Sequence, residues 1–244
     1  MLFSNALQFT RALRLSGRRA LSVLAVAGLL AAALPQSASA QSLQLSTTPS
    51  YTLDFTRLES VRESGEAGSD EPYVLMFVGS LSGPLALVKR TTVFGDVDTG
   101  EDRFQNVRLW GPNGVAAPVP GGNADNLIVL VQVVEHDSSD VEAIRVDVQT
   151  TLSTNLTQYN AAGLSRFDIV SRLKEDMFNK IGAVAEATDG FFSNADDRVG
   201  SPIELRITNS NLAAADTGTP VIKILSVDDG SDGAFRTYYT LRRA

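Results

Sequence analysis

The spacing of hydrophobic positions along this chain of 244 residues changes from an alternating pattern to a helical one and back. Short apolar runs are bounded by clusters of Gly, Pro, Asn, Asp and Ser such as "GPNG" and "DDGSDG", a pattern typical of antiparallel strands joined by turns. The predicted strands are Tyr51–Arg62, Tyr73–Gly79, Leu85–Phe94, Phe104–Trp110, Leu127–Glu135, Pro202–Thr208, Val221–Val227 and Phe235–Leu241. About eight such strands indicate an all-β fold, and we expect an antiparallel β-sandwich.

Two helices are predicted between the fifth and sixth strands. The apolar residues that recur there at helical spacing are Val141, Ile144, Val148, Leu152 and Leu156, followed by Val170, Leu173, Met177, Ile181 and Val184. Ser165 and Asp168 have the spacing of a capping box at the start of the second helix. Two short helices rarely form a core alone, so we expect residues 140–190 or so to be an inserted helical hairpin that packs against the sandwich.

The first 40 residues have the pattern of a secretory signal peptide. They contain four arginines and no acidic residue, then an apolar run from Leu21 to Leu34, then the sequence Ala38-Ser39-Ala40. This pattern predicts cleavage before Gln41 and export to the periplasm or the extracellular space. A polar lead-in, residues 41–50, would then precede a single domain, residues 51–244. The Arg18-Arg19 pair leaves the export route open between two secretion systems.

Charge and composition narrow the classes of partner. The chain has 21 basic and 28 acidic residues, and loss of the four leader arginines leaves 17 against 28, a net charge of −11. A surface with this much negative charge disfavours nucleic acid and anionic lipid as electrostatic partners and favours divalent cations. There is no cysteine, which excludes disulfides and thiolate metal sites.

Acidic residues gather in three clusters at the ends of predicted strands. The clusters are Glu63, Glu66, Asp70 and Glu71; then Glu135, His136, Asp137 and Asp140; then Asp196 and Asp197. Carboxylates so far apart in sequence can meet only if their loops share one end of the fold. Mutual repulsion would then favour a bound cation, and calcium accepts six to eight oxygen ligands in flexible geometry.

Three segments together resemble the C-two domain family of calcium-dependent, lipid-binding sandwiches. "GSDEPYV" is similar to the family signature G-x-S-D-P-Y-V, "LIVLVQVVEHD" to a later strand that ends in D-x-D, and "DDRVGSPIEL" to a D-D-x-I-G segment. "GSDEPY" with the later "DD" segment also resembles secreted bacterial proteins of undefined role. The family resemblance implies an eight-stranded sandwich with a calcium site whose ligands would be Glu63, Asp70, Glu135, Asp137, Asp196 and Asp197.

This sequence departs from the family pattern at several positions. Glu71 interrupts the D-P-Y tripeptide, glutamate replaces aspartate at two positions, and 58 residues separate Asp137 from Asp196 where the family has a short loop. A single ion needs several oxygens within about 2.3–2.6 Å, so each departure weakens the expected site.

We therefore expect a non-enzymatic, exported module that binds calcium and engages a membrane surface or a protein partner. One alternative is a metal-free structural or protein-interaction sandwich, and another is a hydrolase that uses paired carboxylates. The single histidine, His136, is expected to be neither a metal ligand nor a catalytic base. Phe191 and Phe192 are expected to pack the hairpin onto the sandwich, with membrane contact as the alternative.

Overall fold

Nine strands form two antiparallel sheets in the computed structural model, which describes residues 48–63, 70–83, 85–111, 117–137, 139–188, 196–230 and 233–244. The first sheet has the order β4 (Asp102–Trp110), β1 (Ser50–Arg62), β9 (Ala234–Arg243) and β8 (Val221–Asp228), with β5 (Ala117–Pro118) also paired to β1. The second has the order β3 (Ala86–Arg90), β2 (Pro72–Ser80), β6 (Leu127–Glu135) and β7 (Asp197–Glu204). The predicted β-sandwich is confirmed.

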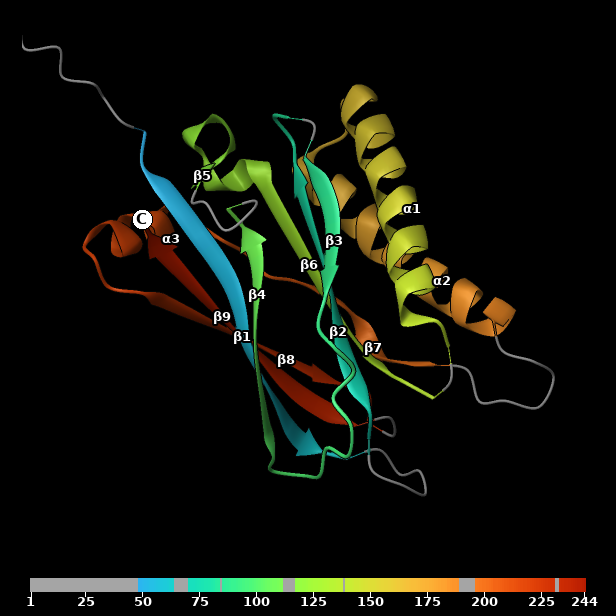
Figure 1. Ribbon diagram of the computed structural model, residues 1–244. Coiled ribbons are helices and arrows are strands. Elements are labelled where there is room, and N and C mark those ends of the chain that lie inside the picture. The colour runs from blue at the N-terminus through green and yellow to red at the C-terminus, as the bar shows by residue number, and fades with distance from the viewer. Residues whose placement is uncertain are drawn as a thin grey trace, which may run out of the picture. The chain divides into compact units, whose positions relative to one another are not determined.

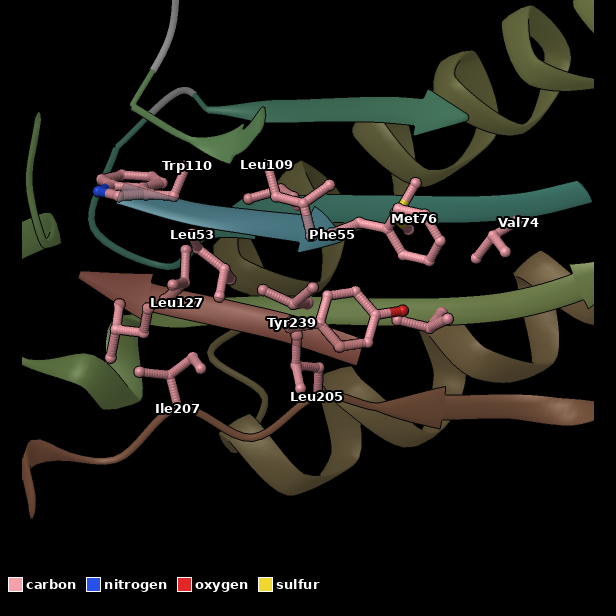
Figure 2. Packing of buried hydrophobic residues seen from close by; sticks show 14 of the residues in the cluster. Leu53, Phe55, Val74, Met76, Leu109, Trp110, Leu127, Leu205, Ile207 and Tyr239 are labelled. Atoms are coloured by element: carbon pink, nitrogen blue, oxygen red, sulfur yellow. The ribbon is translucent and has the colours of Figure 1, made fainter. Parts of the chain in front are cut away.

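The main hydrophobic core lies between the two sheets. Leu53 and Phe55 of β1 and Tyr239 of β9 face Val74 and Met76 of β2 in this core, as Figure 2 shows. Phe235, Tyr239 and Leu241 of β9 belong to this core and are separated by even numbers of residues, as the period of two in a strand requires. The alternation read from the sequence therefore corresponds to the two faces of the first sheet.

The helical hairpin covers the outer face of the second sheet (Figure 1). It consists of α1 (Val141–Ala161) and α2 (Arg166–Thr188), and the buried helix positions include all ten that the sequence spacing selected. The sheet is therefore buried on both sides at β2 and β6, in which every residue is buried. Burial on both faces explains why these two strands are continuous apolar runs without alternation.

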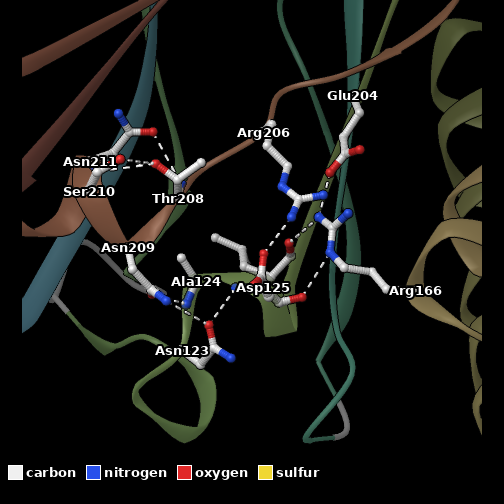
Figure 3. Close-up of polar contacts among 11 residues, drawn as sticks. Asn123, Ala124, Asp125, Arg166, Glu204, Arg206, Thr208, Asn209, Ser210 and Asn211 are labelled. Carbon is white, nitrogen blue, oxygen red and sulfur yellow. Dashed lines mark hydrogen bonds and ion pairs between the residues drawn. The ribbon is translucent and has the colours of Figure 1, made fainter.

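Polar contacts fasten α2 to the sandwich at its N-terminal end. Arg166 donates hydrogen bonds to the carbonyl oxygens of Asp125 (2.9 Å) and Leu127 (3.2 Å) and pairs with Glu204 at the end of β7. The Asp125 carboxylate in turn pairs with Arg206 at 2.5 Å, as Figure 3 shows. Asp125 belongs to the 3-10 turn η3 (Ala124–Asn126), which follows η2 (Pro120–Gly122). The start of α2 is thus tied to two separate segments of the sandwich.

The predicted bounds of the sixth predicted strand, which corresponds to β7, were wrong. Pro202–Thr208 was expected, whereas β7 runs from Asp197 to Glu204. The register explains the difference: Val131 pairs with Ile203 and Val133 pairs with Val199, so three residues of β7 lie opposite one of β6. Gln132 fills this bulge, because its amide nitrogen donates to the carbonyl oxygens of Val199 (2.8 Å) and Gly200 (3.2 Å).

A third helix, α3 (Asn209–Asp216), was not predicted. Thr208 caps it, because its hydroxyl accepts from the Asn211 amide at 3.2 Å while the Asn211 side chain accepts from the Thr208 amide at 3.1 Å. Leu212 and Ala215 are its buried residues. In the described part of the chain, no helix is both long and apolar enough to cross a membrane.

Candidate functional site

The acidic segments converge at the end of the sandwich where β1 and β6 finish and β2 and β7 begin. Asp70 forms an isolated bridge with Val97, and the backbone nitrogen of Glu63 donates to the Thr99 hydroxyl at 3.0 Å. Asp197 is the register partner of Glu135. The expectation that the three acidic clusters share one end of the fold is met for the residues described. Glu66, Phe191 and Phe192 lie outside the described residues.

The Asp196 carboxylate connects several segments at this end of the sandwich. Its side chain is fully buried and accepts hydrogen bonds from the Tyr73 hydroxyl (3.2 Å) and from the backbone nitrogens of Asp137 (3.0 Å) and Ser139 (3.0 Å). Nδ1 of His136 lies 3.2 Å from both carboxylate oxygens. One carboxylate thus joins the start of β2, the segment after β6 and the segment before β7.

The environment of Tyr73 keeps its hydroxyl protonated, and therefore a donor. Burial raises the pKa of the Tyr73 phenol far above its ordinary value, and the neighbouring Asp196 carboxylate raises it further. The ring of His136 packs edge-on against that of Tyr73, with centroids 6.3 Å apart and an interplanar angle of 78°. Tyr73 is accordingly a structural donor to Asp196.

Other carboxylates of the predicted clusters also accept hydrogen bonds from the backbone. Oε1 of Glu135 accepts from the Glu71 nitrogen at 3.1 Å, and Oε1 of Glu63 accepts from the Thr99 nitrogen. Oδ1 of Asp140 caps α1 by accepting from the backbone nitrogens of residues 142 and 143 at 3.0 and 3.1 Å. These side chains therefore organise the loops and begin a helix.

This donor arrangement does not fit a calcium shell built on Asp196. A metal ligand directs oxygen lone pairs at the cation, whereas the Asp196 oxygens already face one O–H and two backbone N–H groups. Among the described residues, no three His, Asp or Glu side chains are placed to hold a metal ion. Calcium binding remains a prediction that solution measurements can test.

A second candidate site, which no sequence pattern indicates, lies between the two sheets at one side of the sandwich. A cleft of about 550 Å³ opens between the edge strands β3 and β4. Its lining combines apolar and basic residues: Leu85, Leu87, Lys89, Arg90, Gln105, Asn106, Val107, Arg108, Leu109 and Trp110. This volume is within the usual range for small-molecule sites, about 300–1,000 Å³.

Comparisons with known proteins identify no family for this chain. No family model matches it, and no curated protein matches it. The chain is similar to a solved structure described as "CC2D1B coordinates ESRCT-III activity during the mitotic reformation of the nuclear envelope", with a TM-score of 0.35 and 12% sequence identity. The match covers 80% of this chain and 55% of that one, so the chain spans about half the length of the structure that it matches. A likeness this distant carries no functional argument.

Proposed function

We propose that this protein is an exported, non-enzymatic binding module whose acidic loop end is held together by its own hydrogen bonds and not by calcium. The observation that carries the proposal is the buried Asp196 carboxylate, which accepts from Tyr73, Asp137 and Ser139. Hydrogen bonds to the ionised form stabilise a buried carboxylate. Repulsion between the acidic clusters is thereby offset without a metal ion.

The export part of the proposal is supported by the leader pattern that ends at Ala40. The binding part is supported by the cleft between β3 and β4, which is large enough for a small molecule. The metal-free interaction sandwich is therefore the form of function that we favour over calcium-dependent binding.

Thermal unfolding with calcium and with a chelator tests the metal-free part. The wild-type protein should melt at the same temperature in about 5 mM calcium and in chelator, because a ligand stabilises only a fold that binds it. Asp196→Asn should lower the melting temperature equally in both buffers, since its neutral oxygen is a weaker acceptor for the Asp137 and Ser139 N–H groups and its NH2 group replaces the oxygen that accepts from Tyr73. Asp197→Asn is the matched control, because that side chain is exposed.

A calcium-dependent rise in the wild-type melting temperature would contradict the proposal. If the loop end does hold calcium, a hundredfold excess over the dissociation constant would add about 2.7 kcal/mol of stability. Loss of that gain in both Asp70→Asn and Asp137→Asn would restore the calcium-binding interpretation.

A further inference from the structure

A polar contact lies at one end of the cleft between β3 and β4. The Thr92 nitrogen donates to Oε1 of Gln105 at 2.9 Å, which joins the segment after β3 to β4. From this contact both strands extend along the lining of the cleft. The chain runs from β3 toward the N-terminus as far as Leu85, and from Gln105 along β4 toward the C-terminus as far as Trp110. At about 3.3 Å per residue, the five steps from Gln105 to Trp110 give the cleft an elongated form.

Apart from Arg108, which pairs with Asp54, the lining changes from polar to apolar along this length. Lys89, Arg90, Gln105 and Asn106 lie near this contact, whereas Leu85, Leu87, Leu109 and Trp110 line the other end. Leu85, Leu87 and Val107 are partly exposed and pack against the main core. The cleft thus presents an apolar floor that continues into the core and a polar end.

The charge of the lining is entirely positive. None of the ten lining residues is acidic, although the chain as a whole carries a net charge of −7. Arg90 pairs with Glu142 at 3.2 Å and Arg108 pairs with Asp54, and neither acid lines the cleft. Lys89 forms no ion pair with any described residue. A ligand that carries one negative charge would therefore complement the polar end.

Hydrogen bonds from α1 exclude a peptide strand as the occupant of the β3 edge. The Val88 nitrogen donates to Oε1 of Gln149 at 3.2 Å, and its carbonyl oxygen accepts from Arg145 at 3.2 Å. The Ala86 carbonyl oxygen accepts from the Ser153 hydroxyl at 3.3 Å. An added strand needs such backbone groups unpaired, so the chemistry of the cleft suits a small molecule.

We propose that this cleft binds a single-chain anionic amphiphile, with its acidic head beside Lys89 and Gln105 and its hydrocarbon chain along Leu87, Val107 and Trp110. The Lys89 ammonium would form a charge-assisted hydrogen bond with the head. Burial of the chain against the apolar floor would supply the hydrophobic part of the binding free energy. This inference rests on the proposed function as a binding module and names the class of ligand.

Lys89 also has a purely structural interpretation, because inward-pointing charges on edge strands discourage aggregation. Lys223 on β8 provides the comparison. Like Lys89 it lies on an edge strand, it pairs in register with the core residue Tyr239, and it does not line the cleft. An edge-protecting role would apply equally to both lysines, whereas ligand binding would involve Lys89 alone.

The fluorescence of Trp110 can report ligand binding, because Trp110 is the only tryptophan in the chain and lies in the lining of the cleft. Laurate, kept below its micelle concentration, is titrated against the full-length mature protein and Trp110 fluorescence is recorded, with calorimetry as a second readout. Dodecyltrimethylammonium, which has the same chain length and a positive head, serves as the ligand control. We expect laurate to saturate a single site and to bind at least about tenfold more tightly than the cationic analogue, a difference of about 1.4 kcal/mol.

Three variants separate the possible outcomes. Lys89→Met should weaken laurate binding by about tenfold or more, and Val107→Phe should weaken it by narrowing the middle of the cleft, while Lys223→Met should leave it unchanged. Melting temperatures in the absence of ligand show whether each variant is folded.

The inference would be overturned by any of three results: no saturable signal, equal affinity for both head groups, or equal effects of the two lysine variants. The calcium result does not depend on any of these outcomes, so failure here leaves the metal-free proposal standing.

Discussion

The Tyr73 hydroxyl donates a hydrogen bond to the carboxylate of Asp196 at 3.2 Å, across 123 residues of sequence. Both side chains are buried, and the bond connects the first residues of β2 to the residue that precedes β7. The hairpin lies between them in the chain, so its two ends return to the same place. The long separation of Asp137 from Asp196 is therefore compatible with their contact.

Tyr73→Phe should lower the free energy of unfolding by about 1–3 kcal/mol, because the buried Asp196 carboxylate loses a donor. Tyr159→Phe is the matched control: its hydroxyl also donates to a carboxylate, Oδ2 of Asp176 at 3.0 Å, but at a partly exposed position. Urea denaturation at neutral pH measures both changes. Equal losses in the two variants would contradict a special role for the buried pair.

Stability should fall at alkaline pH, and Tyr73 should account for part of the fall. Burial, and then Asp196, raise the pKa of folded Tyr73 above the ordinary value of 10.0. A raised folded pKa contributes stability that is complete below the unfolded pKa and is lost as pH rises beyond it. Unfolding free energies measured from about pH 9 to 11.5 should decline less steeply in Tyr73→Phe than in the wild type. Parallel curves would show that Tyr73 does not titrate in this way.

Leu173→Ala in α2 should cost about 2–5 kcal/mol, because this side chain is fully buried between the hairpin and the second sheet. Phe167→Ala in the same helix should change stability by no more than about 0.5 kcal/mol, since Phe167 is 79% exposed. Chemical denaturation compares the two variants. A small loss for Leu173→Ala would mean that the hairpin packs loosely on the sheet.

Substitutions at Gln132 should show how much the bulge contributes to stability. Gln132→Met keeps the approximate shape but removes the donor to the Val199 and Gly200 carbonyl oxygens, and should cost about 1–3 kcal/mol. Gln132→Glu should cost more, because it places a buried negative charge against the same carbonyl oxygens. Hydrogen exchange of β7 measured alongside stability should show the loss of protection beginning at Val199. If Met and Glu are equally tolerated, the bulge does not depend on this amide.

The leader prediction is tested by N-terminal sequencing of protein expressed in a secreting host. The mature chain should begin at Gln41, because Ala38 and Ala40 supply the small residues that the cleavage site requires. Ala40→Arg should block processing, whereas Ser39→Arg should be tolerated at the intervening position. Recovery of Met1 from the exported wild-type protein would refute the prediction.

Local patterns predicted the hairpin well, and tertiary effects explain what they missed. The helical spacing of Val148 and Leu173 was sufficient because each helix has one buried stripe. The start of β7 was misplaced because Gly200 ordinarily interrupts a strand, whereas here the Gln132 side chain of β6 bonds the carbonyl oxygens of Val199 and Gly200 across the bulge. The helix α3 could have been found from its cap at Thr208.

For the candidate sites too, local sequence patterns predicted which residues lie at one end of the fold but not the tertiary contacts that they make there. Sequence order placed Asp70, Glu135 and Asp196 at one end of the fold, but could not show that two backbone N–H groups would donate to Oδ1 of Asp196. Asp140 was grouped with the acidic cluster although its role is to cap α1. The cleft depends on the separation between the edges of two different sheets, which no local pattern records.

The contacts of α1 with β3 mean that the hairpin cannot be treated as a removable insertion. The helix buries one face of the strand and also bonds the Val88 backbone groups at its free edge. A shortened chain that joined residue 139 directly to residue 196 would present an apolar sheet and an unpaired edge to neighbouring molecules. We expect such a chain to associate with copies of itself, because α1 and α2 would no longer cover the sheet and its edge.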